Sequence, residues 1–256
     1  MNAKNVYYSK LKALYNNVQK CYDDELAKRM QSDLQGMTKE EAVAFLAEEY
    51  KKQEEEKIAI KRMQDIHFKL ITARVGKRYI NASLKNFINN SISLSESHSL
   101  EQEEINATLK KELYGFFDNY FMQNLFIKGG PGTGKTYLGS ALIREVIERK
   151  MSALYITAAD FQLWYAARDK TLQMIERMKA VDFLVIDDLQ ETKLANNNIG
   201  FILDNVLGSR YANELPTALI ADIDDLSKIL NNKTLLQVSE NLLSVTLNGT
   251  SIQRTH

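Results

Sequence analysis

The sequence predicts an α/β fold, in which a five-stranded parallel sheet flanked by helices follows a small all-helical N-terminal region. Three features lead to this prediction. A glycine-rich turn joins an apolar strand to a helix, short apolar strands alternate with helical segments after it, and residues 1–66 contain no proline and one glycine. Alternating strands and helices favour a parallel sheet covered on both faces, because each connection crosses the sheet to reach the next strand.

The helical spacing of apolar residues runs through residues 1–66, which we expect to form a helical, partner-binding region. Within it, Thr38 and Glu41 form a capping box that predicts the start of a long helix. This helix continues into a charged stretch over residues 48–62. Two interpretations of that stretch are equally good: a solvated helix face, and a helical hairpin that docks on a partner.

The character of the chain changes after residue 66. Residues 76–87 mix basic, polar and aromatic side chains, and residues 89–99 are rich in serine and asparagine. This composition predicts a linker and an ordered arm over residues 67–99, which lead into the main domain over residues 100–256.

The main domain contains the alternating strands and helices. The expected strands are residues 125–127, 153–157, 183–188, 217–222 and 244–247, and the expected helices are residues 100–121, 135–148, 160–168, 172–179 and 198–213. Ligands of such sheets bind at the carboxyl ends of the strands, so the search for a site concentrates there.

Composition limits what kind of protein this is. Lysine plus arginine and aspartate plus glutamate balance at 33 each, so any binding of nucleic acid has to come from a local patch. The single cysteine, Cys21, excludes a disulfide framework and a cysteine-based zinc site. The start lacks the apolar run of a signal peptide, and no stretch approaches the roughly 18 apolar residues of a membrane helix. We therefore expect a cytoplasmic protein with no membrane partner.

The glycine-rich turn over residues 129–136 fits the phosphate-binding pattern G-x-x-x-x-G-K-[ST] without substitution. Its glycines let backbone N–H groups point inward, and the next helix adds a partial positive charge. Lys135 is expected to reach the β- and γ-phosphates, and Thr136 to bind Mg²⁺. The residues expected to bind ATP or ADP here are Gly130, Pro131, Gly132, Thr133, Gly134, Lys135, Thr136 and Tyr137.

The strand over residues 183–188 ends in two carboxylates, Asp187 and Asp188. A carboxylate pair at a strand tip, about 50 residues after a phosphate loop, is typical of the second half of a nucleotide site. We assign Asp187 to Mg²⁺ and Asp188 to orientation or deprotonation of the attacking water.

These motifs and residues 214–220 together resemble the AAA+ ATPases of the bacterial helicase-loader group, the DnaC/DnaI type, which includes the transposition helper IstB. Residues 77–87 look like the segment that precedes the core in those loaders. Residues 247–254 resemble their closing strand with its arginine, Arg254. The resemblance covers residues from about 75 to the end of the chain. For Arg254 we weigh a contact to the γ-phosphate and a solvated position equally.

The resemblance implies a function. It implies an ATP-dependent loader, or regulator of loading, of the hexameric replicative DNA helicase onto single-stranded DNA. The N-terminal region would bind the helicase, and the AAA+ domains would associate with one another. The alternatives are a transposition helper ATPase like IstB, and a decoy that occupies a helicase or loader without hydrolysing ATP. The fold alone does not distinguish these three functions, so the choice between them has to be argued from the site.

The chain departs from the family pattern in ways that predict weak hydrolysis. Asp222 stands where the family has a polar γ-phosphate sensor; it can orient water, but it repels phosphate unless Mg²⁺ or Lys135 offsets its charge. The usual trans-acting arginine is missing from residues 236–242, and Arg210 and Lys233 are the nearest substitutes. We therefore expect a nucleotide switch more than a motor.

In the loader family a helical insertion between the second and third strands faces single-stranded DNA. The basic residues of this stretch are the candidates for DNA contacts: Arg168, Lys170, Arg177 and Lys179. For the neighbouring aromatics Phe161 and Trp164, packing of the helix on the sheet is favoured over stacking on bases.

Overall fold

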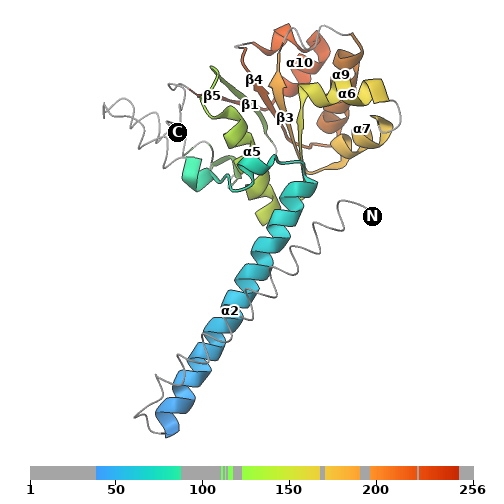
Figure 1. The fold of residues 1–256 in the computed structure, drawn as a ribbon. Coiled ribbons are helices and arrows are strands. Elements are labelled where there is room, and N and C mark those ends of the chain that lie inside the picture. Colours follow the sequence, from blue (N-terminus) through green and yellow to red (C-terminus); the bar gives the residue numbers. More distant parts are fainter. Residues whose placement is uncertain are drawn as a thin grey trace, which may run out of the picture. The chain divides into compact units, whose positions relative to one another are not determined.

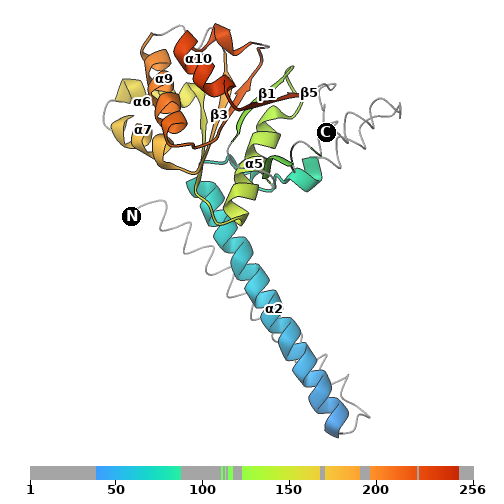
Figure 2. The same cartoon turned by 180° about the vertical axis from the view of Figure 1, so that it is seen from behind.

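The computed structural model of the protein describes residues 39–87, 111, 113, 115–117, 123–167, 171–190, 197–223 and 225–247 (Figures 1 and 2). The chain divides into two compact units, Met1–Arg62 and Met63–His256. The division falls inside the long helix α2 (Lys39–Thr72). In the first unit, residues 39–62 are helical and include the charged stretch, so the predicted helix is present there. Its predicted N-cap, Thr38, and Cys21 lie outside the described residues.

The second unit is built on the five-stranded parallel sheet that the sequence predicts, with strand order β2-β3-β4-β1-β5. Its strands are β1 (Asn124–Gly129), β2 (Ala153–Thr157), β3 (Phe183–Leu189), β4 (Thr217–Ala221) and β5 (Leu242–Leu247). Its helices are α5 (Lys135–Glu148), α6 (Ala158–Ala167), α7 (Thr171–Ala180), α9 (Asn197–Ala212) and α10 (Asn232–Ser239), with the short 3₁₀ turns η1 (Lys77–Tyr79) and η2 (Leu226–Lys228).

Each face of the sheet has its own apolar core. Leu125 and Ile127 of β1 belong to one core, whereas Phe126 between them belongs to the other, because successive side chains of a strand point to opposite faces. Helix α5 covers the first face, and α6, α7, α9 and α10 cover the second (Figures 1 and 2). Strands β2, β3 and β4 are buried over almost their whole length and are mainly apolar, which is the signal that located them in the sequence, whereas Ser244 and Thr246 of β5 are exposed.

Residues 67–87, which lie within the predicted linker and arm, belong to the second unit. Helix α2 continues to Thr72, and Leu70, Val75 and Phe87 are buried in the core beneath α5. The reason is visible in the sequence, since no glycine or proline interrupts the helix before Gly76. The backbone of Ala73 also accepts a hydrogen bond from Tyr155 N–H of β2, at 2.8 Å. The rest of the predicted arm, residues 88–99, lies outside the described residues.

Helix α5 approaches the sheet most closely at Gly139. A Cβ on this residue would lie 2.6 Å from Ile220 Cδ1 and 3.3 Å from Val185 Cγ1, and both neighbours are fully buried. Helix and sheet can therefore pack at this distance only because the side chain is missing.

We expect Gly139→Ala to lower the free energy of unfolding by about 1 kcal/mol, because the steric cost in a packed core exceeds the gain in helix propensity. The matched control is Gly208→Ala in α9, where a Cβ meets its nearest neighbour, Gln237 Oε1, at an ordinary 3.6 Å. That variant should gain about 0.5–1 kcal/mol from helix propensity alone. Urea denaturation measures both, and a stabilised Gly139→Ala variant would contradict the close packing.

No helix in the described part of the chain is long and apolar enough to span a lipid bilayer.

Candidate functional site

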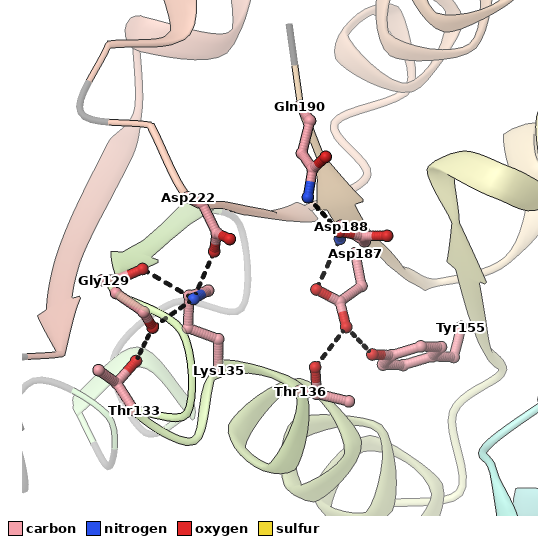
Figure 3. A network of polar contacts seen from close by, with 10 residues as sticks. Gly129, Thr133, Lys135, Thr136, Tyr155, Asp187, Asp188, Gln190 and Asp222 are labelled. Atoms are coloured by element: carbon pink, nitrogen blue, oxygen red, sulfur yellow. Dashed lines mark hydrogen bonds and ion pairs between the residues drawn. The ribbon is translucent and has the colours of Figure 1, made fainter. Parts of the chain in front are cut away.

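The phosphate loop lies between β1 and α5, at the carboxyl end of the sheet (Figure 3). Gly134 is the N-cap of α5 and has φ 94° and ψ 11°, a left-handed conformation that favours glycine. Gly129 also needs to lack a side chain, since a Cβ there would lie 2.4 Å from the carbonyl oxygen of Leu247 in β5. The loop therefore folds as the sequence motif requires, with the first turn of α5 directed at the site.

Lys135 lies at the centre of the loop. Its ammonium donates to the carbonyl oxygens of Gly129 and Gly130, at 2.7 and 2.8 Å, and lies 2.5 Å from Asp222 Oδ1 (Figure 3). The Lys135 side chain is 10% exposed and that of Asp222 is 40% exposed. Of the two cations that could offset the charge of Asp222, Lys135 is therefore in contact with it.

Asp187 is a buried carboxylate that is held from three sides. Its Oδ2 accepts hydrogen bonds from Thr136 Oγ1, at 2.8 Å, and from the Tyr155 hydroxyl. Its Oδ1 accepts the backbone N–H of Asp188, at 2.7 Å. The first turn of α5 and the tip of β3 are thus joined directly, which brings the two predicted metal-binding residues together (Figure 3).

Asp188 has an unusual backbone. Its φ is 60°, and the pairing of β3 with β4 shifts between Ile186 and Leu189, so β3 carries one extra residue there. Bulges of this kind redirect side chains next to functional sites. Gln190 donates a hydrogen bond to Asp188 Oδ1, at 2.9 Å, which helps to fix the carboxylate (Figure 3).

The oxygen atoms of this site suit Mg²⁺. Thr136 Oγ1, at the end of the phosphate loop, and Asp187 Oδ2 are hard oxygen ligands 2.8 Å apart. Among the described residues, no group of three or more histidines, cysteines or acidic residues gathers to form a complete metal cage. Mg²⁺ is usually bound in this way, through one or two protein ligands together with water and substrate phosphates.

Comparison with known proteins agrees with this geometry. The family model described as IstB-like ATP binding protein matches residues 46–220, more than half of the chain. The chain belongs to this family. This assignment confirms the resemblance inferred from the sequence motifs, and the family is one of ATP-binding proteins.

Curated relatives of this IstB-like protein act in DNA replication. It is 28% identical over 152 residues to the replicative helicase loader DnaC of Escherichia coli K12, a match that covers 55% of this chain and 60% of DnaC. It is 27% identical over 190 residues to the chromosomal replication initiator protein DnaA of Streptococcus agalactiae, covering 60% of this chain and 41% of DnaA. The match thus spans 60% of the first relative's length and less than half of the second's.

Solved structures confirm the fold of the IstB-like protein. A crystal structure of the DnaC helicase loader matches with a TM-score of 0.52 at 20% identity, covering 68% of this chain and 100% of that chain. A putative primosome component from Streptococcus pyogenes matches with a TM-score of 0.51 at 19% identity, over 70% of this chain and 92% of that chain.

The structure corrects the prediction for Arg210. This IstB-like protein holds Arg210 in its interior, 1% exposed, where the guanidinium donates to Thr217 Oγ1 and to the carbonyl oxygens of Met178, Val181 and Pro216 at 2.6–2.8 Å. A trans-acting arginine has to reach the nucleotide site of a neighbouring subunit. Arg210, buried with these partners, cannot do so. Lys233, the other substitute, is exposed on α10.

The structure describes two of the four residues predicted to contact DNA. It does not describe the other two, Arg168 and Lys170, nor Arg254, the candidate for a contact to the γ-phosphate. The two described candidates are on α7: Arg177 donates to the carbonyl oxygen of Thr72, at 2.7 Å, and Lys179 pairs with Glu176, at 3.0 Å.

Phe161 and Trp164 of α6 pack on the core beside the sheet, as favoured from the sequence. Phe161 is 1% exposed in the core that α6, α7 and α9 share. Trp164 packs against the same core, and the guanidinium of Arg74 lies over its ring, 5.1 Å from the centroid.

Sequence reasoning missed two polar residues of the site, Tyr155 and Gln190. The sequence does contain a signal for Tyr155, which is the one residue with a polar tip among the first four of β2, a strand that is otherwise apolar up to Thr157. A buried tyrosine hydroxyl usually has a hydrogen-bond partner, and at the middle of an edge strand beside β3 that partner can be a site carboxylate. Gln190 had no such signal, because its contact depends on the bulge at Asp188.

Proposed function

We propose that this chain is an ATP-dependent loader, or a regulator of loading, of a hexameric replicative DNA helicase. The observation that carries the proposal is the joined site of Lys135, Thr136 and Asp187 in a chain of the IstB-like family. The similarity to a replicative helicase loader supports this choice of partner.

Each residue of the site would have its own role in binding or hydrolysing the nucleotide. The backbone N–H groups of the loop and the start of α5 would bind the phosphates of ATP or ADP, and Lys135 would contact the β- and γ-phosphates. Thr136 and Asp187 would hold Mg²⁺, which supplies positive charge that neutralises the phosphates. Asp188, fixed by Gln190, would orient the attacking water.

Weak hydrolysis follows from two features of this site. The ammonium of Lys135 is shared with Asp222, so less of its charge is directed at the γ-phosphate, and the exposed Asp222 carboxylate repels that phosphate. Arg210 is buried and contributes no charge to a neighbouring site. Binding needs the loop and Mg²⁺, whereas fast turnover needs a complete set of charges around the transferred phosphoryl group, so the protein would act as a switch.

The partners are part of this proposal. The first unit would bind the helicase, single-stranded DNA would bind along the basic stretch that includes Arg177 and Lys179, and the AAA+ domains would self-associate. There are two alternatives. Membership of the IstB-like family supports a transposition helper ATPase, and the second alternative is a decoy that occupies a helicase or loader without hydrolysing ATP.

Light scattering of the chain mixed with the hexameric helicase of its own cell, with and without ATP and Mg²⁺, tests the proposal. We expect a complex whose amount changes with nucleotide, and Lys135→Ala should remove the response to nucleotide. A decoy would keep its complex unchanged in that variant. If no complex forms under any nucleotide condition, the helicase proposal fails and the transposition helper becomes the leading alternative.

Two matched variants locate the contact. Ile58 of α2 and Phe201 of α9 are large apolar residues on helices, 65% and 71% exposed, so an aspartate at either position leaves the core intact. Ile58→Asp lies in the first unit and should weaken the complex by about tenfold or more, as loss of a buried apolar contact does. Phe201→Asp should leave it unchanged. The reverse pattern would place the helicase contact on the second unit.

A further inference from the structure

Tyr155 is a buried polar side chain that neither nucleotide motif contains. It lies in the edge strand β2, is 7% exposed, and its hydroxyl donates to Asp187 Oδ2 (Figure 3). The same oxygen accepts the hydroxyl of Thr136, so two hydroxyl donors from different elements converge on one carboxylate oxygen.

Three donors hold the Asp187 carboxylate, and they differ in kind. Oδ1 is bound by the N–H of the next residue, a contact that moves with β3 itself. Oδ2 is bound by Thr136, a side chain that is itself expected to bind Mg²⁺. Tyr155 is therefore the one of these three donors that is neither a metal ligand nor a neighbour in the chain, and it fixes the carboxylate from outside the metal site.

The position of the Tyr155 ring is rigid. Its backbone N–H is bonded to the carbonyl oxygen of Ala73, at 2.8 Å, and β2 pairs with β3 through Tyr155 and Val185. On the other side the ring lies beside α5 at Gly139, where a Cβ would come within 3.4 Å of Tyr155 Cε2. The paired strand and α5 therefore enclose Tyr155 with its hydroxyl on Asp187.

We propose that Tyr155 is a positioning residue of the metal site, which holds the Asp187 carboxylate in the orientation that binds Mg²⁺ with a nucleotide. The inference rests on the proposed nucleotide function and extends it by one residue. Outer partners that orient a metal-binding carboxylate in this way are often worth about 10- to 100-fold in metal affinity.

Tyr155→Phe tests the proposal, because it removes the hydroxyl and keeps the ring. Mn²⁺ replaces Mg²⁺ as the probe, and electron paramagnetic resonance measures free Mn²⁺ in the presence of saturating ADP. We expect Mn²⁺ affinity to fall by about tenfold or more. The affinity for ADP without metal, measured by calorimetry, should change by less than about twofold, because the loop and Lys135 are untouched.

The matched control is Tyr211→Phe. Tyr211 of α9 also donates its hydroxyl to a carboxylate, that of Glu240, which is not part of the nucleotide site. The chemical change is the same, so Mn²⁺ affinity should equal that of the unsubstituted chain. An equal loss of Mn²⁺ affinity in both variants would overturn the inference.

The outcomes separate this inference from the function on which it rests. If the unsubstituted chain binds neither ADP nor Mn²⁺ with ADP, the proposed function fails, and the inference falls with it. If that chain binds both and Tyr155→Phe lowers only Tm, Tyr155 has a structural role and the inference is wrong. Should Tyr155→Phe not fold, 3-fluorotyrosine placed at residue 155 gives a second test. Its ¹⁹F signal should shift when Mg²⁺ is added to the ADP complex, and an unchanged signal would refute the proposal.

Discussion

Replacing Arg210 by methionine should lower the free energy of unfolding by about 3–5 kcal/mol, because several buried carbonyl oxygens lose their hydrogen-bond donor at once. Methionine fills a similar volume but donates nothing, so the carbonyl oxygens of Met178, Val181 and Pro216 would remain buried without their donor. Each unsatisfied buried acceptor costs about 1–3 kcal/mol. Urea denaturation followed by circular dichroism measures the change.

The physical basis of this prediction is the position of Arg210 between three segments. From α9 its guanidinium reaches the end of α7, the turn before β3 and the start of β4. Burial lowers its pKa to about 10, so the group remains charged at neutral pH and its hydrogen bonds are charge-assisted. Because both the folded and the unfolded chain keep this proton at pH 7, the loss of stability should be the same from pH 6 to pH 8.

Arg177→Met is the matched control for Arg210→Met. Arg177 is partly exposed on α7 and, like Arg210, donates to a backbone carbonyl oxygen, in this case that of Thr72. Loss of this exposed contact should cost less than about 1 kcal/mol. Equal losses in the two variants would mean that Arg210 contributes no more than a surface arginine.

Arg210 also marks a limit of sequence-based prediction. Its helix was predicted over residues 198–213, as one of the helical segments that alternate with short, mainly apolar strands. Whether an arginine on such a helix faces solvent or a set of carbonyl oxygens depends on segments distant in the sequence. Local patterns do not contain that information, so the residue was assigned to an intersubunit role that its burial excludes.

The candidate site shows the same division between local and long-range features. The phosphate loop was predictable because its spacing is itself the structural requirement, as the left-handed Gly134 illustrates. The bulge that turns Asp188, and the hydroxyl that reaches Asp187 from β2, depend on how three strands align. The sequence shows that the charge of Asp222 needs to be offset near a phosphate. That Lys135 contacts Asp222 follows from the strand order, in which β4 lies next to β1.

Replacing Lys135 by alanine should weaken ATP binding by about 100-fold, which corresponds to about 2.8 kcal/mol. Two effects add in this variant. The phosphates lose a charge-assisted contact, and the Asp222 carboxylate, which Lys135 neutralises at 2.5 Å, is left to repel them. Fluorescence of a labelled ATP measures the affinity, and Lys228→Ala, which changes an exposed lysine of η2, should leave it unchanged.

The double variant Lys135→Ala/Asp222→Asn separates the two effects. If Asp222 repels the phosphates once its partner is gone, asparagine at that position should restore about tenfold of the lost affinity, and the two substitutions will not be additive, as for residues in direct contact. Additive effects would show that Asp222 does not act on the nucleotide through Lys135. Unchanged ATP binding in Lys135→Ala itself would disprove the nucleotide site, since no other ammonium of the described residues takes the place of this one between the loop carbonyls and the strand tip.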